Sequence, residues 1–159
     1  MKDLESVAAH GCNPKISKFM SNEFPDSVEK WKAFLEFAVT NEKILYLAIE
    51  IDGQAVGGIG ISLQNDKTAE LGYWLGEDFW GNGIMTEAIG EIVRLGFERF
   101  EIDKIYAKPF ENNYASHKVL EKAGFILETK NEKAILKNGE FRDELIYTVK
   151  RDIRKKCTR

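Results

Sequence analysis

The chain has 159 residues, of which 43% are hydrophobic and 31% charged, and its formal net charge is −3. This balance predicts one globular domain over residues 1–159 and argues against a disordered chain. It also argues against a broad basic surface for nucleic acid or anionic lipid, and no apolar run approaches the ~20 residues of a membrane span. Cys12 and Cys157 lack metal-ligand spacing. Together with the lack of a signal-peptide pattern, this predicts a cytoplasmic protein with reduced thiols and no metal site.

The first quarter of the chain predicts helices. A short helix is expected from Asp3 to His10, and Asn13-Pro14 opens a turn after it. The segment Phe24–Ser27 then forms a turn and helix cap. Apolar residues recur at helical spacing from Trp31 to Val39, which predicts a second, longer helix.

Three antiparallel strands are expected next. Leu45–Ile51 and Ala55–Leu63 alternate in polarity and are joined at Asp52-Gly53, a strong hairpin signal. A turn at Asn65-Asp66 leads into a third strand over Thr68–Leu75.

A glycine-rich loop follows the third strand and opens a helix from about Gly83 to Phe100. The first N–H groups of a helix have no internal partner and carry partial positive charge. The segment Trp80-Gly81-Asn82-Gly83 therefore predicts an anion site for a phosphate or pyrophosphate. Two nucleotide motifs are excluded, because no lysine follows Gly83 as in a P-loop and Thr86 replaces the third glycine of a Rossmann fingerprint.

A strand over Lys104–Ala107 is expected to return parallel to the third strand through a right-handed crossover. The remaining predicted elements are a helix over Asn113–Lys122 closed by Gly124, strands over Phe125–Thr129 and Glu140–Val149 around an Asn138-Gly139 turn, and a basic, frayed tail over residues 150–159.

Two sequence blocks carry a resemblance to a known family. Leu71–Leu75, Phe79–Gly83 and Thr86-Glu87-Ala88 resemble the GNAT acyl-CoA N-acetyltransferases, and in particular the ribosomal-protein-alanine (RimJ/RimL-like) branch. A second block, Asn113–Phe125, resembles the family pattern Asn-x-x-Ser followed by Glu-Lys-x-Gly-Phe. The chain departs from the general loop pattern, because Trp80 stands at the Gln/Arg position and Met85 at the final Gly/Ala position.

This resemblance implies an α/β GNAT fold, in which helices flank a mixed, mostly antiparallel twisted sheet with one splayed parallel strand pair. In the family a bulge produces the splay, and Gly72 and Gly76 are consistent with one. Family members usually carry a strand before the first helix, and this chain starts too late to contain it. Either the sheet lacks that edge strand or the chain is truncated.

The implied cofactor is acetyl-CoA. Its pyrophosphate would meet the backbone N–H groups of Gly81, Gly83, Met85 and Thr86, and its pantetheine arm would pair with the third strand like an added strand. A backbone N–H of Trp74 or Leu75 would serve the thioester oxygen. The expected cofactor-binding residues are Tyr73, Trp74, Leu75, Gly81, Asn82, Gly83, Ile84, Met85, Thr86, Asn113 and Ser116.

Three residues are candidates for proton transfer. Ser116 is expected near the sulfur as a hydrogen-bond donor or relay, and Tyr114, with an ordinary pKa of ~10, is the competing acid. Glu70, upstream on the strand, could draw a proton through water from the bound ammonium. The alternatives stay open, because Asn113 also suits a helix cap and Glu70 also suits an ion pair with a neighbouring lysine.

The predicted reaction is acetyl transfer to a primary amine, at a protein N-terminus or on a small molecule, by direct attack in a ternary complex. The acceptor would enter between the Phe19–Pro25 turn, the helix that follows it and a loop over Glu132–Asn138, with an acidic rim of Glu23, Glu36 and Glu132. A small-molecule acetyltransferase for polyamine, aminoglycoside-like or amino-acid amines is one alternative. A non-catalytic acyl-CoA-binding module is another. Homodimers are common in the family.

Overall fold

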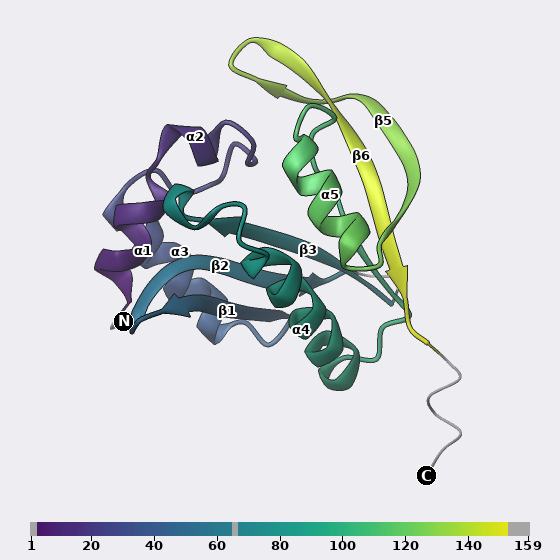
Figure 1. The fold of residues 1–159 in the computed structure, drawn as a ribbon, viewed down its shortest axis with the longest axis horizontal. Helices are drawn as coiled ribbons and strands as arrows, with labels where there is room; N and C mark the ends of the chain where they lie inside the picture. Colours follow the sequence, from purple (N-terminus) through teal and green to yellow (C-terminus); the bar gives the residue numbers. More distant parts are fainter. Residues whose placement is uncertain (1–2, 65–66, 153–159) are drawn as a thin grey trace.

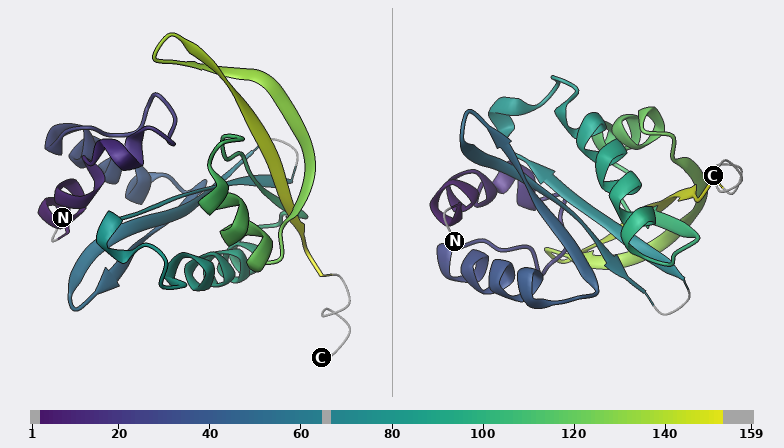
Figure 2. Two further views of the ribbon diagram at one scale, coloured as in Figure 1. Left: turned by 45° about the horizontal axis from the view of Figure 1, so that its top comes forward. Right: turned by 90° about the horizontal axis from the view of Figure 1, so that it is seen from below.

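The computed structural model describes residues 3–64 and 67–152. Six strands form one mixed sheet in the order β1-β2-β3-β4-β6-β5, with helices on both faces (Figures 1 and 2). The strands are β1 (Ile44–Ile51), β2 (Gln54–Leu63), β3 (Thr68–Leu75), β4 (Lys104–Ala107), β5 (Ile126–Lys137) and β6 (Glu140–Lys150). The helices are α1 (Leu4–Gly11), α2 (Pro14–Ser17), α3 (Val28–Thr40), α4 (Ile84–Arg99) and α5 (Tyr114–Lys122), with one 3-10 turn, η1 (Glu77–Phe79).

Both predicted two-residue hairpin turns are confirmed. Asp52 and Gly53 have φ values of 50° and 78°, and Asn138 and Gly139 have values of 51° and 79°. Two successive left-handed residues match the right-handed twist of the flanking strands, which is why Asp-Gly and Asn-Gly suit these positions. The expected turn at Asn65-Asp66, Cys157 and most of the basic tail lie outside the described residues.

The parallel pair β3–β4 splays as expected. Pairing runs only from Thr68↔Lys104 to Glu70↔Tyr106, whereas β3 stays paired with β2 up to Leu75. Among the residues that the structure describes, the edge of β3 that faces β4 therefore has no strand partner beyond Glu70. The bulge expected from Gly72 is absent from the β2–β3 pairing, whose register is continuous over residues 57–63 and 69–75.

The last hairpin is longer than the sequence predicts. The strand expected over Phe125–Thr129 runs from Ile126 to Lys137, so the Glu132–Asn138 segment is not a loop but mostly strand. A register shift between Asn131 and Ile135 interrupts the pairing with β6. The hairpin projects beyond the rest of the sheet and arches over the side where α2 lies (Figures 1 and 2).

Two hydrophobic clusters hold the helices against the sheet. On one face α4 buries Met85, Ile89 and Ile92, spaced four and three residues apart, against strand residues such as Ile61. On the other face Trp31 of α3 is 1% exposed and packs on Trp74 of β3. Successive β3 side chains point to opposite faces, so Tyr73 joins the α4 cluster while Trp74 joins the α3 cluster.

Candidate active site

The loop before α4 is shaped for close approach of a ligand to backbone. Gly81 and Gly83 have φ values of 77° and 76°, and a Cβ built on either would point into open space. Gly83 is the N-cap and offers no side-chain hydrogen bond. The first backbone bond into the helix is Glu87 N to Gly83 O, at 3.2 Å. Within the described chain, the N–H groups of the first helical turn thus have no acceptor, as an anion site requires.

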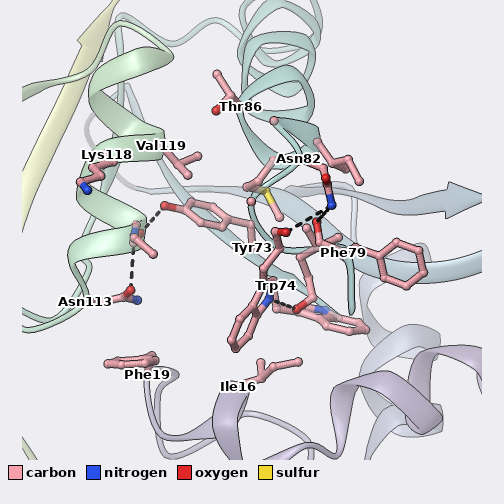
Figure 3. A pocket seen from close by; sticks show the side chains of 18 of the residues that line it. Ile16, Phe19, Tyr73, Trp74, Phe79, Asn82, Thr86, Asn113, Lys118 and Val119 are labelled. Atoms are coloured by element: carbon pink, nitrogen blue, oxygen red, sulfur yellow. Dashed lines mark hydrogen bonds between the residues drawn. The ribbon is translucent and has the colours of Figure 1, made fainter. Parts of the chain in front are cut away.

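Trp80, which departs from the family pattern, fixes this loop to the end of β3. Its indole Nε1 donates to the Leu75 carbonyl at 2.7 Å. Asn82 Nδ2 donates to the carbonyls of Phe79 and Trp80 at 3.3 and 3.2 Å (Figure 3). The side chains of Trp80 and Asn82 therefore stabilise the loop internally and leave its backbone N–H groups available.

A cleft of about 320 Å³ runs from this loop to the splay of β3 and β4. Tyr73 projects across it toward α5, and Ile16 and Phe19 border it on the α2 side (Figure 3). All eleven expected cofactor-binding residues line the cleft: Tyr73, Trp74, Leu75, Gly81, Asn82, Gly83, Ile84, Met85, Thr86, Asn113 and Ser116.

A chain of hydrogen bonds crosses the cleft from β3 to the start of α5. The hydroxyls of Tyr73 and Ser116 are hydrogen-bonded to each other, and Ser116 N donates to Asn113 Oδ1 at 3.3 Å (Figure 3). Asn113 is thus the N-cap of α5 and also lines the cleft. Burial raises the pKa of Tyr73 to about 12, so its hydroxyl keeps its proton at neutral pH. The pair can act as a hydrogen-bond donor or proton relay.

Tyr114, the competing acid, is not brought into this arrangement. Its side chain is 70% exposed and lies outside the linings of the cavities described here. It contacts the ring of His117 edge-on instead.

A second cavity of about 240 Å³ adjoins the cleft and shares Tyr73, Asn113 and Ser116 with it. Glu70 lines this cavity, as does Lys108, whose Nζ lies 3.0 Å from Glu70 Oε1. The Tyr106 hydroxyl donates to Glu70 Oε2 at 3.4 Å. The expected lysine partner of Glu70 is therefore present, and Glu70 also faces the predicted acceptor side.

The acceptor walls are only partly those expected. Phe19, Met20 and Ser21 line the second cavity, and Ile135 of β5 lines it from the hairpin. The helix after the turn, α3, contributes to neither lining, because its Trp31 is buried in the core. Glu23, Glu36 and Glu132, the residues of the expected acidic rim, are exposed and line neither cavity.

The hairpin is tied to the α2 region above this cavity. Lys137 Nζ donates to the carbonyl of Ser17 at 2.6 Å and also to that of Met20. Asn22 Nδ2 donates to the Leu136 carbonyl at 3.1 Å. Burial and the charge of Arg142 lower the pKa of Lys137. These contacts join the two segments that border the cavity.

Sequence reasoning missed three charged residues. Lys118 and Lys122 are spaced four apart on α5, and both line the cleft. Helical spacing does not group them with Asn113 and Ser116, because Lys118 lies two residues after Ser116 and Lys122 six residues after it. Glu144 of β6 lines the second cavity and is only 7% exposed. Burial raises its pKa, with a further contribution from the Glu70 charge, while the Lys108 ammonium acts in the opposite direction.

These residues fit an anionic ligand with an amide-bearing arm. The open N–H groups and the glycine backbone suit a diphosphate, and Lys118 and Lys122 add positive charge to the lining of the cleft. The unpaired edge of β3 offers N–H and C=O groups to an extended chain of amides. No cluster of His, Cys, Asp and Glu suited to a metal occurs in residues 3–64 and 67–152. No helix in the same ranges has the length and apolarity to cross a membrane.

Comparisons with known proteins agree with this geometry. The family model "Acetyltransferase (GNAT) domain" matches residues 1–126. An uncharacterized N-acetyltransferase of Bacillus subtilis, YoaA, is 26% identical over 155 residues, which span 93% of this chain and 88% of the relative. The ribosomal-protein-serine acetyltransferase of Escherichia coli is 33% identical over 82 residues, which span 52% of this chain and 46% of the relative. The crystal structure of the microcin C7 self-immunity acetyltransferase MccE, in complex with acetyl-CoA and AMP, has a TM-score of 0.76 at 27% identity and covers 93% of this chain and 83% of that one.

Proposed function

Because this chain belongs to the GNAT acetyltransferase family and is an acetyl-CoA-dependent N-acetyltransferase, we propose that its acceptor is the free α-amino group of a protein or peptide. The observation that carries the proposal is the junction at Tyr73 and Ser116, where the anion-binding cleft meets a cavity with two carboxylates. An α-amino group, with a pKa of ~8, is much easier to deprotonate than a lysine at ~10.4. The E. coli relative, by its name, acts on a ribosomal protein.

The cofactor supplies the acetyl group as an activated thioester. Its diphosphate would be held by the backbone N–H groups of Gly81, Gly83, Met85 and Thr86, with Lys118 and Lys122 alongside. The unpaired edge of β3 from Tyr73 to Leu75 would hold the pantetheine amides, and an N–H of Trp74 or Leu75 would serve the thioester oxygen.

Ser116 is proposed to donate a hydrogen bond or a proton to the departing sulfur. The Tyr73 hydroxyl, protonated at neutral pH, would supply the next proton through its hydrogen bond with Ser116. A thiol, with a pKa near ~8.5, needs little help as a leaving group, so this pair acts mainly by orientation. Glu70 offsets the charge of Lys108, which leaves the second cavity with the negative charge of Glu144 and would favour a positively charged amine there.

Purified protein with acetyl-CoA and a panel of acceptors tests the proposal by release of free thiol. The panel contains peptides that differ in their first residue, the same peptides with a blocked N-terminus and an internal lysine, and small amines. We expect release with some free N-termini and none with their blocked counterparts. Release only with blocked peptides, or with no acceptor at all, would contradict the proposal.

A small-molecule amine is the second candidate acceptor. The second cavity is only about 240 Å³, and the Lys137 contacts join the segments that border it. Such a space suits a polyamine or amino-acid amine as well as one N-terminal residue. Release with small amines alone in the same panel would favour this candidate.

A further inference from the structure

Glu144 is a buried carboxylate with no hydrogen-bond partner in the described part of the chain. It is 7% exposed and lines the second cavity from β6. Among the described residues, Trp31 Nε1 is the only fully buried side-chain N or O atom without a partner, so the Glu144 oxygens are not sealed in the core and can be reached from the cavity. Glu70 in the same cavity has partners for both oxygens, Lys108 at Oε1 and Tyr106 at Oε2. Of these two carboxylates, Glu144 therefore has the oxygens free to meet a ligand.

The charges around Glu144 favour a cationic ligand. The charged groups that act on it are the Lys108 ammonium and the Glu70 carboxylate, and these two are paired at 3.0 Å. The other polar side chains of the cavity are uncharged at neutral pH, namely Ser21, Tyr73, Asn113 and Ser116. With both carboxylates ionised, the cavity carries one net negative charge, which an ammonium group would balance.

We propose that Glu144 is the general base of the transfer, taking a proton from the acceptor ammonium, while Glu70 neutralises Lys108 so that the cavity keeps the net negative charge that draws this ammonium in. The proposal rests on the proposed function. Glu144 and the Tyr73–Ser116 pair border one cavity, so they can serve the two sides of a single reacting centre.

The protons balance in this scheme. Glu144 takes one proton from R–NH3⁺, and the neutral amine forms the C–N bond to the acetyl carbon as the C–S bond breaks. The nitrogen loses a second proton when the amide forms, and the departing thiolate gains one through Ser116 and Tyr73. Glu144 returns its proton to solvent, so one proton is released for each acetyl group transferred.

The environment of Glu144 suits this role. Its burial disfavours the charged carboxylate and so raises its proton affinity toward the range of a useful base. A carboxylate already held by a lysine and a tyrosine would have to break those contacts to reach an amine. Glu70 is therefore better placed to position the ammonium than to deprotonate it.

Glu144→Gln tests the proposal with the acceptor peptide that gives the fastest thiol release. We expect kcat to fall by ~10²–10⁴, the usual contribution of a general base. In the plot of kcat/KM against pH, the fall in activity at low pH that reports protonation of Glu144 should disappear. Activity should recover as rising pH deprotonates the amine directly. Glu70→Gln should raise the KM of the amine and keep the low-pH fall. Glu140→Gln, with an exposed side chain on the same strand outside both cavities, is the matched control and should behave as wild type.

A measurement on the wild-type protein keeps the test valid if Glu144→Gln does not fold. In protein labelled with ¹³C at glutamate side-chain carboxyls, one NMR signal should titrate at a higher pH than the others. Its midpoint should equal the midpoint of the low-pH fall in kcat/KM. Glu144→Asp should shift that midpoint. If no glutamate titrates with the low-pH fall, or if folded Glu144→Gln stays within threefold of wild type with this fall intact, the role of Glu144 is overturned. Wild type that releases no thiol with any acceptor overturns the proposed function as well, which distinguishes the two failures.

Discussion

The Tyr73 hydroxyl is hydrogen-bonded to the Ser116 hydroxyl where the two cavities meet. The two residues are 43 positions apart, and they meet because Tyr73 points from β3 toward the face on which α5 lies. The contact joins the two sequence blocks that carry the family resemblance. It gives the transfer step a protonated hydroxyl pair beside the proposed position of the sulfur.

Removing either hydroxyl should slow turnover more than it weakens cofactor binding. We expect Tyr73→Phe and Ser116→Ala each to lower kcat by roughly 10–100-fold, at the low end for acid catalysis because a thiol is a good leaving group. Since the two act as one unit, the double variant should be little worse than the worse single variant. Tyr114→Phe is the exposed control and should keep wild-type kcat. Multiplicative losses would show that the hydroxyls act independently.

Alkaline unfolding should report the burial of Tyr73. Burial raises its folded-state pKa from 10 to about 12. Only the unfolded state ionises between those values, so the stability due to neutral Tyr73 is complete below pH 10 and is lost as pH rises toward 12. Tyr73→Phe should flatten the fall of the unfolding free energy between pH 10 and 11, measured in urea. If the unfolding free energy of Tyr73→Phe falls with pH as steeply as that of wild type, Tyr73 is not shielded from water.

Alanine substitutions at two glycines of the α4 region should change the free energy of unfolding in opposite directions. Gly83 has a φ of 76°, and Gly83→Ala should cost about 1–2 kcal/mol and raise the KM for acetyl-CoA, because an L-residue resists this conformation. Gly90 lies inside the helix with open space at its Cβ, and Gly90→Ala should stabilise by about 0.4–1 kcal/mol with KM unchanged. Urea unfolding and steady-state kinetics measure both. An unchanged KM for Gly83→Ala would remove the diphosphate assignment.

The packing of α1 on Trp31 predicts a second pair of opposed variants. A Cβ at Gly11 would meet the indole ring, with Cε2 at 2.7 Å and Nε1 at 2.9 Å. The ring is 1% exposed and wedged against Phe24, Phe34 and Trp74, so it cannot move aside. Gly11→Ala should therefore destabilise by about 1–3 kcal/mol.

Gly96→Ala is the comparison for that variant. A Cβ at Gly96 meets mainly Cδ1 of Ile61, which is as buried as Trp31 but is the end of a flexible side chain rather than a rigid ring, and alanine favours the helix. Its unfolding free energy should stay within about 1 kcal/mol of wild type. If Gly96→Ala proves as costly as Gly11→Ala, side-chain flexibility does not decide the outcome.

Local chemistry explains which parts of the fold were predictable. Asp52-Gly53 and Asn138-Gly139 specify their turns because both residues of each must take a positive φ. The loop at Gly83 was recognisable because backbone shape and unpaired N–H groups follow from glycine and a helix start. Asn113 proved to be both a helix cap and a cleft residue, so the two interpretations of it were compatible.

The missed features depend on contacts between distant segments. β5 is exposed along nearly all of its length, so it shows no alternation of buried and exposed residues, and its pairing with β6 defines it as a strand. Glu144 looks like a surface residue in sequence. It is buried in the fold, where its backbone pairs with that of Phe110 next to the β4–β6 ladder. The periodicity of the sequence therefore does not predict that Glu144 is buried.

The cofactor's position is tested most directly by the backbone amide signals of ¹⁵N-labelled protein during titration with acetyl-CoA. We predict that the largest shifts fall on Gly81, Gly83, Met85 and Thr86, and that S-acetylpantetheine, which lacks the diphosphate, shifts Tyr73 and Leu75 but leaves the loop unchanged. The account would be contradicted if saturating acetyl-CoA changed the chemical shifts of other amides but not those of Gly81, Gly83, Met85 and Thr86.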